Sequence, residues 1–145
     1  MIRNHLGDVI LAGVEQGTGA GDPMIEEAQA CLFGLQCAKD AGLLYLSVEG
    51  DCSILVNLLR SSSIQDTFIG FISLIESFSF CSWSFVKRNG NKVAHDLAHL
   101  QTFSFSRRVW STNISASILD MASTDMYDYI NSNIMRSPSS IKKKG

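Results

Sequence analysis

The stretch LLYLSVEGD, residues Leu43–Asp51, decides the fold class of this 145-residue chain. Its first part, Leu43–Val48, is an almost continuous apolar run, which is typical of a strand buried in a parallel sheet. The run leads into Gly50 and Asp51, and in open α/β sheets the functional groups collect at the carboxyl ends of the strands. Glu49 lies two residues before Asp51 and therefore shares its face of the strand. The stretch predicts both a parallel sheet and a site at its edge.

Upstream of this strand, the sequence predicts a hairpin and a long helix. A β-prone run at Val9–Val14 follows a Gly-Asp turn, and residues 2–4 fit the end of a preceding strand. Asp22 and Pro23 are a favourable N-cap and first residue for a helix, whose apolar residues recur at helical spacing until Gly42. A helix that leads directly into a buried strand is typical of α/β proteins.

Downstream of the same strand, apolar residues at helical spacing predict short helices near residues 54–59 and 68–78. Phe80–Val86 alternates apolar residues with serines, which predicts a strand, and the turn that follows leads into another helix. The order β, β, α, β, α, α, β, α is typical of a mixed α/β sheet flanked by helices. A weaker apolar pattern at residues 114–119 predicts one more short helix.

Length and composition indicate one globular domain, because a chain that is 46% hydrophobic can bury a core at this size. The net charge of −2 excludes a global basic field, so a nucleic-acid partner would need a local basic patch. The four cysteines form no CxxC pair and are expected to be reduced core residues. No segment resembles a signal peptide or a membrane span, which predicts an intracellular protein. We expect the domain at residues 1–125 and a flexible Ser- and Lys-rich tail at 126–145.

Glu27 and Asp51 are the candidate metal ligands. Glu27 lies near the start of the helix that leads into the strand before Asp51, and carboxylates from separate elements can converge on Mg²⁺, which prefers oxygen ligands. Two such ions can activate a water molecule and stabilise the leaving oxygen in phosphodiester hydrolysis. Local spacing alone favours a structural interpretation, in which Glu27 complements the helix dipole and Asp51 caps the next helix.

Two further groups of polar residues have alternative interpretations. His95 and His99 are four residues apart, as in metalloprotease helices, but no third ligand is evident, so two exposed or capping histidines are expected. Lys87, Arg88 and Lys92 surround a predicted turn, where they are either solvated side chains or contacts to the phosphates of a nucleic acid.

Three segments follow one another in a distinctive order: Glu27–Ala38 (EAQACLFGLQCA), Leu46–Asp51 (LSVEGD) and Phe85–Ala98 (FVKRNGNKVAHDLA). Together they resemble the plant reverse-transcriptase-associated ribonuclease H type-1 family. That family typically reads E-A-x-A-x-x-x-G-L-x-x-A, then V-E-S-D, then V-x-R-x-x-N-x-x-A-H-x-L-A. Arg3–Val9 is similar to the family's turn between the second and third strands. The resemblance, which is strongest between Met1 and Phe105, implies a ribonuclease H-like mixed sheet.

The resemblance also implies an activity, namely metal-dependent cleavage of RNA in RNA–DNA hybrids with Mg²⁺ or Mn²⁺ as cofactor. Glu27 and Asp51 match two of the four carboxylates that hold the metal ions in the family. His95 occupies the position of the last carboxylate, as a histidine does in many plant members, and is the third candidate catalytic residue. The nucleic-acid contacts implied by the resemblance lie in the third segment and are Lys87, Arg88, Asn91 and Lys92.

The remaining carboxylate belongs to an Asp-Gly motif on the family's first strand, which would precede Met1 and is expected to be missing here. In this fold the first strand is central, antiparallel to the second strand and parallel to the strand at Leu43–Val48. Its loss exposes unpaired backbone edges, at a cost of about 1–3 kcal/mol for each buried unpaired group. We therefore expect a nucleic-acid-binding domain of weak or no hydrolytic activity. The alternative is a non-catalytic retroelement-derived remnant or interaction module that binds no nucleic acid.

Overall fold

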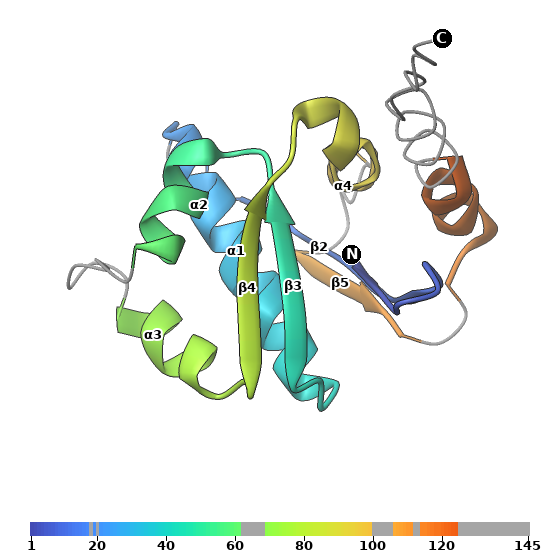
Figure 1. Ribbon diagram of the computed structural model, residues 1–145. Helices are drawn as coiled ribbons and strands as arrows, with labels where there is room; N and C mark the ends of the chain where they lie inside the picture. The colour runs from blue at the N-terminus through green and yellow to red at the C-terminus, as the bar shows by residue number, and fades with distance from the viewer. Residues whose placement is uncertain (18, 20, 62–68, 100–105, 112–113, 125–145) are drawn as a thin grey trace, which may run out of the picture.

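The computed structural model describes residues 1–17, 19, 21–61, 69–99, 106–111 and 114–124, and it has a mixed α/β fold (Figure 1). Its strands form two sheets. One has the order β1 (Ile2–Arg3), β2 (Val9–Glu15), β5 (Arg107–Trp110), and the other consists of β3 (Tyr45–Gly50) and β4 (Phe80–Phe85). Within the described ranges, no strand of one sheet is hydrogen-bonded to a strand of the other. The predicted mixed α/β class is confirmed.

The parallel sheet is regular over its whole length. β3 and β4 pair residue by residue from Tyr45 opposite Phe80 to Gly50 opposite Phe85. The prediction of a strand at Leu43–Val48 was wrong by two residues at each end. Leu43 instead belongs to the cap that follows the preceding helix, because its backbone N–H donates to the carbonyl oxygen of Ala38 at 3.0 Å. This bond and the one from Gly42 N–H to the Lys39 carbonyl oxygen form a Schellman-type helix end.

Helix α1 (Pro23–Asp40) packs against both sheets. It begins as predicted, because the Asp22 carboxylate accepts the Met24 backbone N–H at 2.9 Å. It ends before Gly42, whose φ of 73° is a left-handed conformation that glycine adopts without steric cost. A short turn joins α1 to β3, so the two elements run in opposite directions and the start of α1 lies near the end of β3 (Figure 1).

The main core lies between the parallel sheet and three helices, α1, α2 (Ser53–Arg60) and α3 (Ile69–Glu76). The predicted helix at 54–59 is confirmed. In α3, Phe71 and Leu74 are buried, and Ile72 and Ile75 are half-buried. The buried residues of this core are Ala28, Leu35, Ala38, Leu55, Leu59, Phe71, Leu74 and Phe78.

The antiparallel sheet has smaller cores of its own. Leu11 of β2 packs with Phe33 and Cys37 of α1. On another side, Ala12 of β2 packs with Leu97 of α4 (Lys92–Ala98) and with Ile118. Ile118 lies in a helix at residues 116–124, which the weak apolar pattern at residues 114–119 predicted.

Strand β5 was not predicted from the sequence. Its residues Arg107 and Arg108 are charged and it has no apolar alternation, so it depends on tertiary contacts. It pairs antiparallel with β2, and Arg107 forms an ion pair with Glu15 and lies 4.9 Å from the centre of the Phe33 ring. The expected tail at 126–145 lies outside the described residues. In the part of the chain that the structure describes, no helix combines the length and apolar character needed to cross a membrane.

Candidate functional site

Two carboxylates lie at the end of the parallel sheet where β3 finishes. Asp51 follows the last residue of β3, and its side chain is 13% exposed. Glu27 lies near the start of α1, which the antiparallel course of α1 and β3 brings to the same end. Burial raises the pKa of the Glu27 carboxyl above its usual value, and the negative charge of Asp51 raises it further. The two carboxylates are therefore close enough for their charges to interact, and their role as metal ligands stays a prediction.

Arg88 is the positive charge at this site. Its Nε atom lies 3.6 Å from Asp51 Oδ2, and its charge partly opposes the rise in the Glu27 pKa. β4 places Arg88 there, because the ladder continues past the strand with Val86 N–H donating to the Gly50 carbonyl oxygen at 3.0 Å. A 3₁₀ helix, η2 (Arg88–Asn91), then turns the chain towards α4 above the strand ends (Figure 1).

The basic segment predicted to contact phosphates is exposed around this turn. Lys87, Arg88 and Lys92 are all exposed, and Asn91 is half-buried. Lys92 forms an ion pair with Asp96 one turn further along α4. Asn91 is the N-cap residue of α4, although its side chain makes no capping hydrogen bond.

His95 lies on the exposed side of α4. Its ring is 4.3 Å from the ring of His99, and the Nδ1 atom of His99 is 2.8 Å from the His95 carbonyl oxygen. The interaction of His99 with the backbone at the end of α4 fits the interpretation of these histidines as exposed or capping residues. No contact between His95 and either Glu27 or Asp51 is observed among the described residues, so the role of His95 stays a prediction.

The donor set at the strand end suits one hydrated magnesium ion. Mg²⁺ is commonly held by one or two carboxylates and keeps several of its waters, which matches Glu27 and Asp51. Among the residues that the structure describes, no group of three or more His, Cys, Asp or Glu side chains is arranged to hold a metal ion.

Cys31 lies one helical turn after Glu27, and its ionisation is affected by its surroundings. Burial, together with the nearby Cys81 and Glu27, raises the pKa of its thiol to about 12. Because the thiolate is the reactive form, this cysteine is chemically inert near neutral pH.

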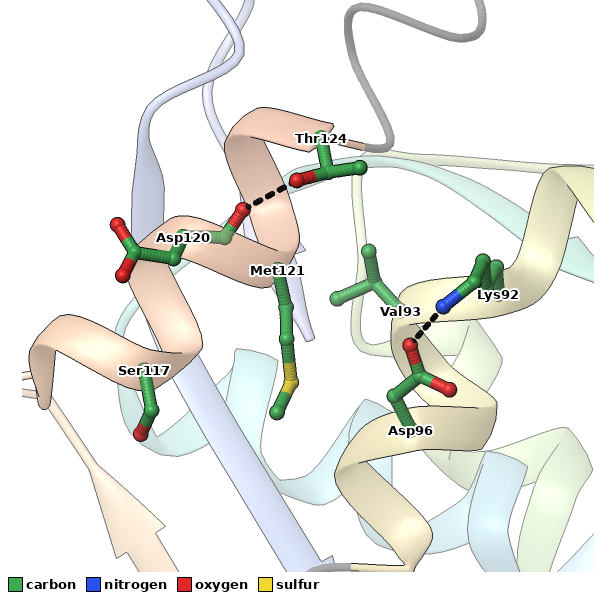
Figure 2. A pocket seen from close by; sticks show the side chains of 7 residues that line it. All are labelled: Lys92, Val93, Asp96, Ser117, Asp120, Met121 and Thr124. Atoms are coloured by element: carbon green, nitrogen blue, oxygen red, sulfur yellow. Dashed lines mark hydrogen bonds and ion pairs between the residues drawn. The ribbon is translucent and has the colours of Figure 1, made fainter.

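The cavity in Figure 2 is separate from the acidic pair. It has a volume of about 370 Å³ and lies between α4 and the helix at 116–124. Lys92 turns towards Asp96 on one wall, and the Thr124 hydroxyl donates to the Asp120 carbonyl oxygen at 3.0 Å on the other (Figure 2). The lining residues are Lys92, Val93, Asp96, Ser117, Asp120, Met121 and Thr124, and neither Glu27 nor Asp51 is among them.

Fold and site together define the class of protein: a ribonuclease H-like α/β domain with an acidic pair at the carboxyl end of its parallel strands. The comparison with protein families agrees, since a family model described as reverse transcriptase-like matches residues 1–101. The chain belongs to this reverse transcriptase-like family. No curated protein and no solved structure gave a significant match.

Proposed function

We propose that this chain is a nucleic-acid-binding domain of the RNA–DNA hybrid ribonuclease lineage, with weak or no hydrolytic activity by itself. The observation that carries the proposal is the meeting of Glu27, Asp51 and Arg88 at one end of the parallel sheet. The acidic residues can bind a divalent cation and the basic residue can bind a phosphate, so together they suit contact with a nucleic-acid backbone.

The acidic and the basic residues would have separate roles. Glu27 and Asp51 would hold one hydrated Mg²⁺ or Mn²⁺, which when bound lowers the pKa of a coordinated water and stabilises negative charge on a phosphate oxygen. Lys87, Arg88 and Lys92 would contact phosphates, and RNA would be distinguished from DNA by its 2′-hydroxyl groups along the minor groove. The inert Cys31 thiol adds no competing nucleophile.

The low expected activity follows from the number of ligands. Positioning both the attacking water and the leaving oxygen normally requires a pair of metal ions, whereas two carboxylates suit one. Losing a single preorganised electrostatic element typically lowers a rate by about 10²–10³. His95 is a nitrogen donor, which is a poor ligand for a hard cation such as Mg²⁺.

The catalytic part of the proposal is tested on a labelled RNA–DNA hybrid with Mg²⁺ and with Mn²⁺. We expect little cleavage by the chain as it stands, and more after an N-terminal extension that supplies a strand carrying Asp-Gly. Asp51→Asn in the extended chain should abolish the gained activity. Robust cleavage by the unextended chain, lost in Asp51→Asn, would contradict the expectation of weak activity.

Binding is tested separately by titrating the hybrid at several salt concentrations. Replacing Lys87, Arg88 and Lys92 together by alanine should weaken binding and flatten its dependence on salt, because fewer counterions are released from the phosphates. A salt dependence that is unchanged in the triple variant would exclude this segment as the contact surface.

A second candidate function is an interaction module that binds no nucleic acid. It is favoured by the internal pairing of two of the basic side chains, Arg88 with Asp51 and Lys92 with Asp96, in a chain of net charge −2. Absence of hybrid binding at low salt, where electrostatic attraction is strongest, would favour this candidate.

Within the reverse transcriptase-like family, we also propose a place in its plant ribonuclease H type-1 branch, of retrotransposon origin. The support is the resemblance of Glu27–Ala38, Leu46–Asp51 and Phe85–Ala98 to that branch. The genomic sequence upstream of Met1 is the test. An open reading frame for an apolar strand with Asp-Gly would support the enzyme lineage, and its absence would favour the remnant.

A further inference from the structure

We propose that Arg88 is the internal counter-ion of the Glu27–Asp51 pair and competes with a divalent cation for it. The inference rests on the proposed function, since it takes the acidic pair as the cation site. It assigns Arg88 a role in positioning and in cation affinity, in addition to contact with phosphates.

The geometry supports a displaceable contact. Asp51 is only 13% exposed, so water screens its charge poorly and a nearby cation stabilises it. Arg88 is 76% exposed and its Nε atom lies 3.6 Å from Asp51 Oδ2, which is longer than a hydrogen bond. Because the Arg88 side chain is mostly solvated and the contact is long, the ion pair can open without unfolding the domain.

The backbone permits such an opening as well. Arg88 is the first residue of η2, after β4 has ended, whereas Asp51 directly follows β3. The nearest strand anchor of Arg88 is the hydrogen bond from Val86 N–H to the Gly50 carbonyl oxygen. The Arg88 side chain can therefore change rotamer while both strands and the two carboxylates keep their places.

A consequence follows for nucleic-acid binding. A bound cation neutralises the carboxylates and releases Arg88, whose guanidinium then becomes available to a phosphate. By thermodynamic linkage, a phosphate that holds Arg88 away also strengthens cation binding by the same factor. The ion pair thus couples the two ligands through one side chain.

The test is Mn²⁺ binding to the whole chain without nucleic acid, measured by the electron paramagnetic resonance signal of free Mn²⁺. Arg88→Met removes the competing charge and should tighten Mn²⁺ binding about fivefold. Arg88→Lys keeps the charge and should stay closer to the wild type. Lys39→Met is the matched control, because it removes one exposed positive charge at the opposite end of α1 and should change the affinity little.

Three other outcomes would contradict the inference. Unchanged or weaker Mn²⁺ binding in Arg88→Met would show that Arg88 does not compete, and equal tightening in Lys39→Met would indicate a general effect of net charge. If no variant binds Mn²⁺, the acidic pair is not a cation site and the inference fails with it. Hybrid binding by the same samples without metal then reports separately on the proposed nucleic-acid-binding function.

Discussion

The parallel and antiparallel sheets of this domain are stabilised in different ways. β3 and β4 pair over six residues each and share the main core with three helices. The antiparallel sheet has a two-residue strand, β1, and a four-residue strand, β5, and it packs against much smaller apolar clusters. Because hydrophobic stabilisation grows with buried apolar area, the parallel half should dominate the stability of the domain.

The antiparallel half is also held by polar contacts. Arg107 pairs with Glu15 and lies over the Phe33 ring, and Arg108 lies 4.8 Å from the centre of the Trp110 ring. Exposed contacts of this kind contribute little to stability, and they weaken at high salt. Helix α1 packs against both sheets and so joins the two halves, although they are stabilised in different ways.

The largest expected effect comes from weakening the main core. Leu35 of α1 is 2% exposed, so Leu35→Ala should lower the free energy of unfolding by about 2–5 kcal/mol through lost burial and a new cavity. Urea denaturation measures this change in the free energy of unfolding. Ile54→Ala is the control, because Ile54 of α2 is 62% exposed and should change stability by no more than about 0.5 kcal/mol. Similar losses in both variants would contradict burial in the main core as the source of this stability.

A smaller, local effect is expected in the antiparallel half. Arg107→Ala removes both the ion pair with Glu15 and the contact with Phe33, so β5 should separate from β2 more often. Hydrogen exchange should become faster at Gln16, whose N–H donates to the Ser106 carbonyl oxygen at 2.7 Å. Exchange in β3 and β4 should stay as in the wild type. Faster exchange in those strands would show that the two sheets open as one unit.

The smallest expected effect is at the site itself. The pKa of Glu27 is raised chiefly by burial, so the folded state favours its protonated form. The stability that this gives is fully present below the usual glutamate pKa of 4.5 and is lost as the pH rises through the folded pKa. Glu27→Gln should therefore stabilise the metal-free domain at neutral pH, and this gain should vanish as the pH falls.

The gain is expected to stay below about 1 kcal/mol, because Glu27 is partly exposed and solvent screens its charge. Thermal melting in the presence of a chelator, across the acidic to neutral range, measures it. The control is Gln29→Glu on the same turn of α1, because it keeps a residue of good helix propensity and adds one negative charge. A gain for Glu27→Gln that persists at acidic pH would exclude titration of Glu27 as its cause.

The sequence predicted regular elements wherever local chemistry specifies them. Asp22 and Gly42 bound α1 as expected, and the alternation of serines in Phe80–Val86 identified β4. It failed for β5, where two arginines conceal a strand that only pairing with β2 stabilises. Propensity is a local property, and an edge strand made by tertiary contacts has no local signal.

What the sequence by itself determined is the class of fold, because the apolar run before Asp51 and the helix containing Glu27 have patterns typical of an α/β sheet. The role of Glu27 and Asp51 as metal ligands is implied by the family resemblance and stays a prediction. The tertiary structure alone decided that the strands lie in two sheets and that Arg88 faces Asp51. Such contacts join residues far apart in the chain, and their energy depends on distance and burial, which no local pattern encodes.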